Sequence, residues 1–206
     1  SGNTEFYVIN SIRHQSLKNK NILLRVDLNV PFRDGKILDD TRIKSAIPTL
    51  KLILKNKGRP IILSHFGRPK GHISQALSLK HVLPSLISHL GENIIFCDAV
   101  TEKKINSFIE KSPTNTSILL ENTRFLAGEE TNDPNTGQML ANLGELFCND
   151  AFSACHRAHA STVGVTKILP GFSGLLLEKE LLTLKTALLK PRRPTVAIVG
   201  GSKVST

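Results

Sequence analysis

Aromatic residues are scarce in this sequence, and their scarcity narrows the choice of partner for a strongly basic chain. Phe, Trp and Tyr make up 5% of the 206 residues, tryptophan is absent, and the net charge is +10. A positive charge of this size indicates an anionic partner. Nucleic-acid-binding proteins interleave clustered Lys and Arg with aromatic rings on which bases stack. Here the basic residues are scattered, which favours a small phosphorylated anion over nucleic acid or a membrane surface.

Cysteine is equally scarce. The sequence has three, Cys97, Cys148 and Cys155, and no CxxC pair. An odd number without that spacing argues against a disulfide framework or a zinc ribbon and favours a reducing compartment, the cytoplasm. Cys155, His156 and His159 lie close together in the sequence. A metal site needs further ligands, which we do not find, so we predict none.

Long apolar runs are missing as well. No run approaches the roughly 20 residues that cross a bilayer. The first residues, SGNTEFYVIN, show no basic stretch followed by an apolar one, so we see no secretory signal. We find no internal repeat. With 206 residues the chain can form one domain, or one domain and part of another.

Short apolar runs are present and alternate with segments of helical spacing. Runs of strand length occur at 22–26, 60–63, 94–97, 117–120, 146–148 and 195–199. Residues 42–56 and 79–90 repeat apolar side chains on one helical face, and Gly91 is a predicted C-cap. Asp-Gly within FRDGK, residues 32–36, predicts a short hairpin. The alternation predicts an α/β, doubly wound, Rossmann-like fold, with a mostly parallel sheet and helices on both faces.

Polar residues follow the ends of these expected strands. They are Asp27 and Asn29; His65 and Arg68; Glu121, Asn122 and Arg124; Asp150, His156, Arg157 and His159; and Gly200, Gly201 and Lys203. In an open α/β sheet the ligand lies beyond the carboxyl ends of the strands. Taken singly, each has a structural explanation, such as a solvated arginine, a turn-forming Asp27 or a helix-capping Asp150. Their coincidence at several strand ends favours an anion site.

The stretch IILSHFGRP, residues 61–69, illustrates the pattern. Its apolar residues predict a buried strand that ends directly before a histidine and an arginine. Gly67 permits a tight turn at the edge of the sheet, and Pro69 stiffens the exit. We therefore expect His65 and Arg68 to face a ligand.

Six motifs carry a family resemblance. LLRVDLNVP, DDTRI, SHFGRPKG, LLENTRF, NDAFSACHRAHAST and TVAIVGGSKVS together resemble phosphoglycerate kinase, in that family's order and at similar spacings. GLLLEKEL, residues 174–181, is similar to the start of the helix that links the two domains of the family. The resemblance implies a 3-phosphoglycerate-binding domain at 1–172, a linker helix at 173–190, and the start of a nucleotide-binding domain at 191–206. It further implies a second half that binds Mg-ATP or Mg-ADP.

The implied reaction is the glycolytic transfer of a phosphoryl group between ATP and the carboxylate of 3-phosphoglycerate, which gives 1,3-bisphosphoglycerate. That carboxylate is already ionised at neutral pH, so no general base is needed, and catalysis becomes a matter of positioning and charge neutralisation. By resemblance, the substrate is bound by Asp27, Asn29, Arg42, His65, Arg68, Arg124 and Arg157. Arg42 and Lys203 would act on the transferred group, and Gly200, Gly201 and Lys203 on the nucleotide side.

Two alternatives stay open: a phosphate-binding module without catalysis, and a basic nucleic-acid-binding protein. For these 206 residues alone we expect 3-phosphoglycerate binding without turnover, and for the full-length enzyme a monomer. The apolar segment 195–199 has open edges, so we expect it to pair with a second copy or to fold onto the first domain. Either arrangement would keep Lys203 far from Arg42.

Overall fold

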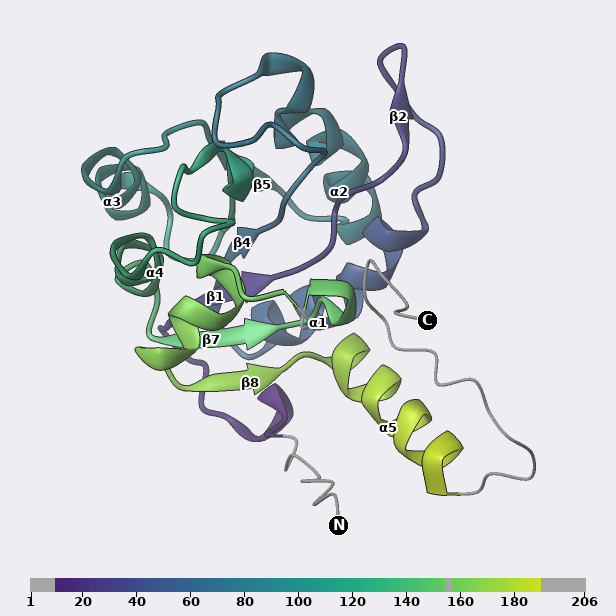
Figure 1. Ribbon diagram of the computed structural model, residues 1–206. Helices are drawn as coiled ribbons and strands as arrows, with labels where there is room; N and C mark the ends of the chain where they lie inside the picture. Colours follow the sequence, from purple (N-terminus) through teal and green to yellow (C-terminus); the bar gives the residue numbers. More distant parts are fainter. Residues whose placement is uncertain (1–9, 155–156, 190–206) are drawn as a thin grey trace.

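Six parallel strands form the central sheet of the computed structural model, which describes residues 10–154 and 157–189 (Figure 1). The strands are β1 (Asn21–Arg25), β4 (Arg59–Leu63), β5 (Ile94–Cys97), β6 (Ser117–Leu120), β7 (Leu146–Asn149) and β8 (Gly171–Ser173). Their order across the sheet is β5-β6-β4-β1-β7-β8. A separate antiparallel hairpin joins β2 (Phe32–Arg33) to β3 (Lys36–Ile37).

Helices connect the strands. They are α1 (Thr41–Lys55), α2 (Leu83–Leu90), α3 (Glu102–Lys111), α4 (Pro134–Ala141) and α5 (Leu175–Leu189). Single turns occur at Ile12–His14, Gln75–Leu77, Leu79–Val82, Thr123–Phe125, Phe152–Ala154, Ala160–Gly164 and Val165–Lys167, the sixth being a π-helical turn. In Figure 1, α3 and α4 lie together on one side of the sheet, whereas α1 and α2 lie on the other.

The strands alternate between these two faces. Leu24 and Ile62 pack into the apolar core that contains α1 and α2, whereas Leu23 and Ile61 pack into the core that contains α3. Both sets are fully buried. A parallel strand covered on both sides is apolar at every position, which is why these strands appear in the sequence as continuous apolar runs. The predicted doubly wound α/β fold with helices on both faces is confirmed.

Most predicted elements are found, with shifts of a residue or so at their ends. The predicted helix at 79–90 is a 3₁₀ turn followed by α2, and Gly91 is its left-handed C-cap with a φ of 77°. The hairpin turn has Asp34 and Gly35 at positive φ, 52° and 75°. The sequence did not reveal β8, because Gly-Phe-Ser is too short to form an apolar run, nor did we predict α3 and α4.

The register of β1 with its neighbours aligns three strand ends. Arg25, the last residue of β1, is paired with Leu63 of β4 on one side and with Asn149 of β7 on the other. The chain leaves β1 toward β4 and later returns to the opposite side of β1 as β7. The loops that follow these strands therefore diverge above β1, which opens a crevice of the kind where α/β proteins bind ligands.

The predicted boundary between the first domain and the linker helix falls where β8 ends and α5 begins. Strand β8 ends at Ser173 and α5 begins at Leu175, beyond the carboxyl end of the sheet (Figure 1). The division at 172 and 173 stays a prediction. The segment 195–199, with its expected pairing, lies outside the described residues, and so do Gly200, Gly201 and Lys203.

Candidate anion-binding site

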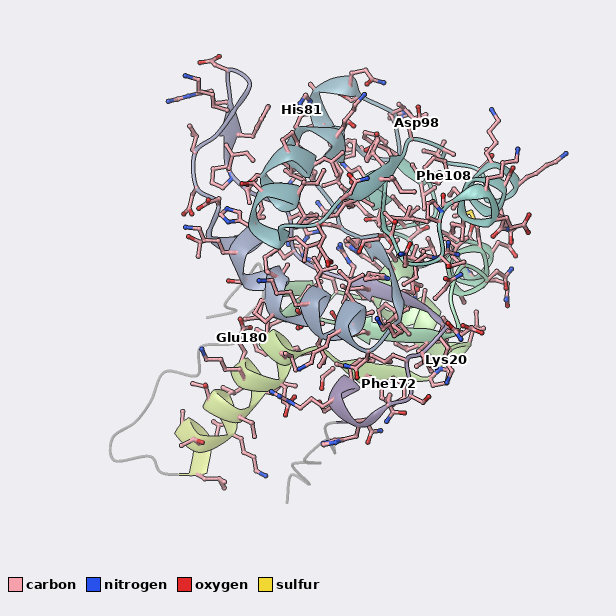
Figure 2. The ribbon with its side chains drawn as sticks, turned by 180° about the vertical axis from the view of Figure 1, so that it is seen from behind. Lys20, His81, Asp98, Phe108, Phe172 and Glu180 are labelled. Carbon is pink, nitrogen blue, oxygen red and sulfur yellow. The ribbon has the colours of Figure 1, made fainter. Side chains whose placement is uncertain are left out.

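A cavity of about 490 Å³ lies at the carboxyl ends of β1, β4 and β7. In Figure 2, Glu180, which lines it, lies on the left, and Lys20, which precedes the first residue of β1, lies on the right. The charged and polar residues of its wall are Arg25, Asp27, Asn29, Arg42, Ser45, His65, Arg124, Asp150, Ser153, Arg157, His159 and Glu180. Four arginines and two histidines converge on one hollow, so the cavity is suited to a small polyanion.

Arg25 forms the floor of this site. It closes a strand of aliphatic residues and is only 1% exposed. One guanidinium nitrogen donates to the Val26 carbonyl at 3.2 Å, and another lies 2.8 Å from Nδ1 of His65. Its Nε has no partner among the described residues. Burial lowers the pKa of Arg25, and the charges of Glu129 and then Asp27 oppose that shift.

The contact with Arg25 fixes the state of His65. A guanidinium can only donate, so Nδ1 of His65 accepts and the proton of the neutral imidazole is on Nε2. Burial, followed by the charges of Arg25 and Arg124, lowers the pKa of His65 to about 2. His65 is therefore neutral at physiological pH. It provides an N–H donor to this site and adds no positive charge.

Asp27 and Asn29 are positioned by the loop after β1. Asn29 donates its backbone N–H to Oδ1 of Asp27 at 2.9 Å, and Ser153 donates its hydroxyl to Oδ2 at 2.9 Å. Arg42, in the first turn of α1, donates to the Asn29 carbonyl at 2.7 Å and lies 3.4 Å from the Asp27 carboxylate. The Arg42 side chain is 53% exposed, so it stands at the mouth of the site, where an incoming anion can compete for it.

The loop after β4 brings two parts of the site together through Gly67. Its N–H donates to Oδ1 of Asn29 at 2.9 Å, and its carbonyl accepts from Arg124 at 3.1 Å. Gly67 has a φ of 62°, and a Cβ there would lie 2.6 Å from Leu77. The tight turn predicted from the sequence is therefore present, and a larger residue would disrupt it.

Asp150 connects the site to α5. Its Oδ1 accepts the backbone N–H groups of Leu176 and Leu177 at 3.0 and 3.3 Å, in the first turn of that helix. Burial raises the pKa of Asp150 to about 6, although these hydrogen bonds oppose the shift. Helix capping was the structural alternative for Asp150, and Asp150 does cap a helix, but one that begins 25 positions later in the chain. Glu180, one turn further along α5, also lines the cavity.

The structure brings together six of the predicted substrate residues. Asp27, Asn29, Arg42, His65, Arg124 and Arg157 all line the cavity. Arg68 does not line it; its side chain is exposed, and its charge acts on Arg124, so its role stays a prediction. Glu121 and Asn122 are structural residues here: Glu121 accepts from Ser78 and Leu79, and Asn122 bonds the backbone of Phe66 and Leu77.

Two basic lining residues were absent from the sequence-based site. Arg25 was treated as part of a strand, although a charged residue inside an apolar run is itself a signal of a functional or paired group. His159 was noted after β7 but given no role in the site. His156 and Cys155, its neighbours in the same motif, lie outside the described residues.

The chain matches the family model described as phosphoglycerate kinase over residues 12–206. The chain belongs to the phosphoglycerate kinase family. Among curated proteins of the family, that of Roseobacter denitrificans is 50% identical over 187 residues, which are 91% of this chain and 46% of the relative. The phosphoglycerate kinase of a Jannaschia species is 48% identical over 197 residues, 96% of this chain and 49% of the relative. The chain thus spans about half the length of these relatives.

Solved phosphoglycerate kinases have the same fold. The Coxiella burnetii enzyme superposes with a TM-score of 0.80 at 34% identity, covering 91% of this chain and 47% of that one. The Pyrococcus horikoshii enzyme gives a TM-score of 0.81 at 28% identity, covering 90% and 47%. Between residues 10 and 189, leaving out 155–156, we find no helix long and apolar enough to cross a membrane.

Proposed function

We propose that this chain is the substrate-binding half of a phosphoglycerate kinase and that the cavity binds 3-phosphoglycerate. The observation that carries the proposal is the convergence of Arg25, Arg42, Arg124 and Arg157 on one hollow at the carboxyl ends of the strands. A phosphate and a carboxylate on one small molecule require several fixed cations. Arginine provides these, because its guanidinium stays charged and donates two parallel hydrogen bonds.

The polar groups suggest how the substrate would lie. Arg124, Arg157 and the Nε2–H of His65 would bind its 3-phosphate, with Arg68 contributing from the rim. Asp27 and Asn29 would bind the hydroxyl and carboxylate end, beside Arg42. Asp27 is already an acceptor of three donors, and an arriving hydroxyl would take the place of one of them.

The reaction we assign is the reversible transfer of a phosphoryl group from ATP to the substrate carboxylate. The acceptor is ionised at neutral pH, and no proton has to be removed from it. The work of the site is therefore to hold the acceptor oxygen in line and to neutralise the charge on the moving group. Arg42 is the described residue best placed for this, since its exposed guanidinium stands beside Asp27 and Asn29.

The nucleotide and its magnesium belong to the part of the reaction that the described residues do not supply. Gly200, Gly201 and Lys203 are assigned to that side, and they lie outside the described residues. We infer that residues 1–206 alone bind 3-phosphoglycerate without turning it over. We further propose that the full-length enzyme is monomeric and cytoplasmic. Neither nucleic acid nor a membrane is a partner in this proposal.

Titration calorimetry of the 206-residue chain tests the proposal. We expect 3-phosphoglycerate to bind at low ionic strength, glycerate without its phosphate to bind far more weakly, and added salt to weaken binding. Arg157→Ala should lower the affinity at least tenfold, whereas Lys103→Ala, which removes an equal charge at an exposed position of α3, should change it little. Absence of binding to the wild-type chain, or fast turnover of Mg-ATP by it, would contradict the proposal.

A further inference from the structure

A buried carboxylate lies next to the anion site without lining it. Glu129 is 0% exposed, in the loop that follows Arg124. Its Oε1 accepts the backbone N–H of Ser161 at 2.7 Å, and its Oε2 accepts the Ser161 hydroxyl at 2.5 Å. Both oxygens are acceptors, which is the bonding pattern of a carboxylate. Among the described residues it forms no ion pair.

Glu129 also joins two loops that bear cations of the site. Its own carbonyl accepts the N–H of Ala160 at 2.9 Å, next to the Ser161 contacts. The turn that begins at Ala160 is preceded by His159, whose N–H donates to the Thr162 hydroxyl. That hydroxyl in turn donates to the carbonyl of Arg157 at 2.6 Å. Through Ser161, Glu129 therefore holds the segment that carries Arg157 and His159 against the loop that carries Arg124.

The charge of Glu129 acts on three cationic or titratable groups of the cavity wall. Burial lowers the pKa of Arg25, and Glu129 is the strongest of the charges that oppose this shift. The pKa of His159 is likewise lowered by burial, with Glu129 again the first opposing charge. Burial lowers the pKa of Arg124 as well, and Glu129 opposes this shift, though less than Glu130 does. One buried negative charge thus compensates several groups that repel one another in an empty site.

We propose that Glu129 is the internal counter-charge of the anion site: it stabilises the cationic cluster while the cavity is empty, and it thereby limits the affinity for the bound anion. The inference rests on the proposed function, since the anion in question is 3-phosphoglycerate. The bound substrate and Glu129 neutralise the same arginines, so each reduces the electrostatic stabilisation that the other provides. Such a restraint favours release, which a reversible transferase needs in both directions.

If Glu129 is a counter-charge, removing its charge raises the affinity for the anion, whereas a packing role predicts unchanged or weaker affinity. In Glu129→Gln the amide oxygen can accept from the Ser161 N–H, and the amide N–H can donate to the rotated hydroxyl, so both contacts have a replacement. Only the charge is lost. The empty protein should then melt at a lower temperature, while its affinity for 3-phosphoglycerate should rise on the order of tenfold at low ionic strength.

The experiment compares three variants with the wild-type 206-residue chain by calorimetry and thermal melting. Ser161→Ala keeps the charge and removes one hydrogen bond; it should lower the melting temperature without tightening binding. Glu110→Gln removes an equal charge from an exposed position of α3 and should change neither quantity appreciably. Affinity that is unchanged or weaker in Glu129→Gln would overturn the proposal, because a purely structural role predicts that result.

Inorganic phosphate is the second probe, and it covers the case in which Glu129→Gln is unstable. If the variant folds only with phosphate present and unfolds on its removal, the anion has replaced the carboxylate, as proposed. If it stays unfolded at saturating phosphate while Ser161→Ala folds, the proposal fails. The phosphate series also separates the two hypotheses. If wild-type protein does not bind 3-phosphoglycerate, the proposed function is refuted. If phosphate nevertheless raises the melting temperature of Glu129→Gln more than that of the wild type, the counter-charge role of Glu129 still holds.

Discussion

Replacing Asp150 by asparagine should remove the loss of folding stability that the wild-type protein suffers as the buried Asp150 carboxyl ionises with rising pH. The carboxylate is 1% exposed, caps the first turn of α5, and has its pKa raised from 3.8 to about 6. Folded protein therefore holds this proton more tightly than unfolded protein does. Stability from Asp150 is complete below pH 4, and it falls as the pH rises from about 4 to about 6.

The size of the effect follows from the shift. A difference of about 2.2 pKa units, at 1.36 kcal/mol for each, is about 3 kcal/mol. Asparagine keeps an oxygen that can accept from Leu176 and Leu177 but has no charge to bury. Part of this difference is already present at pH 4, so we expect the free energy of unfolding of Asp150→Asn, minus that of the wild type, to rise by about 2 kcal/mol between pH 4 and pH 7.

Urea unfolding followed by circular dichroism, repeated across this pH range, measures that difference. Asp133→Asn, at the N-cap of α4, is the control for exchanging a capping carboxylate for an amide. A difference that stays flat with pH would mean that burial does not raise the pKa of Asp150. A difference that falls with rising pH would mean that the N–H groups of α5 stabilise the ionised form more than burial opposes it.

Three further predictions concern the same region. In NMR titrations of the chain, His65 should stay neutral with its proton on Nε2 down to about pH 4, because burial and Arg25 hold its pKa near 2. Protonation between pH 5 and 7 would contradict the lowered pKa, and a neutral ring with its proton on Nδ1 would contradict the assigned tautomer. Gly174→Ala should lower the free energy of unfolding by about 2 kcal/mol or more, because the added Cβ would overlap Oδ1 of Asp150. Gly171→Ala, whose Cβ would have no atom nearer than 3.6 Å, should lower it by under about 1 kcal/mol. Urea denaturation compares the two variants, and equal losses would show that the surroundings of Gly174 relax freely. In a kinase that joins this chain to a nucleotide-binding half, steady-state kinetics should show Arg42→Ala lowering kcat by about 100-fold or more and Arg68→Ala mainly raising KM; similar effects of both on both parameters would show that these roles are wrongly divided.

The sequence by itself determined the fold class and most of the site. Continuous apolar runs occur where a parallel strand is buried on both faces, and the helical spacing of apolar residues marks helices between them, so both could be predicted without tertiary information. Residues at strand ends could be assigned to one crevice because all strands of a parallel sheet end at the same edge. That reasoning found Asp27, Asn29, His65, Arg124 and Arg157, and the family resemblance added Arg42; all six line the cavity.

Only the tertiary structure decided which groups act together. Arg25 occupies a strand position, and only the register with β4 and β7 shows that it ends at the crevice. The neutral state of His65 depends on a contact 40 positions away in the sequence, and the capping role of Asp150 on a helix that starts 25 positions later. Glu129 had no local signal at all. Burial and long-range contacts set the pKa values and charges of such residues, and a local pattern does not encode either.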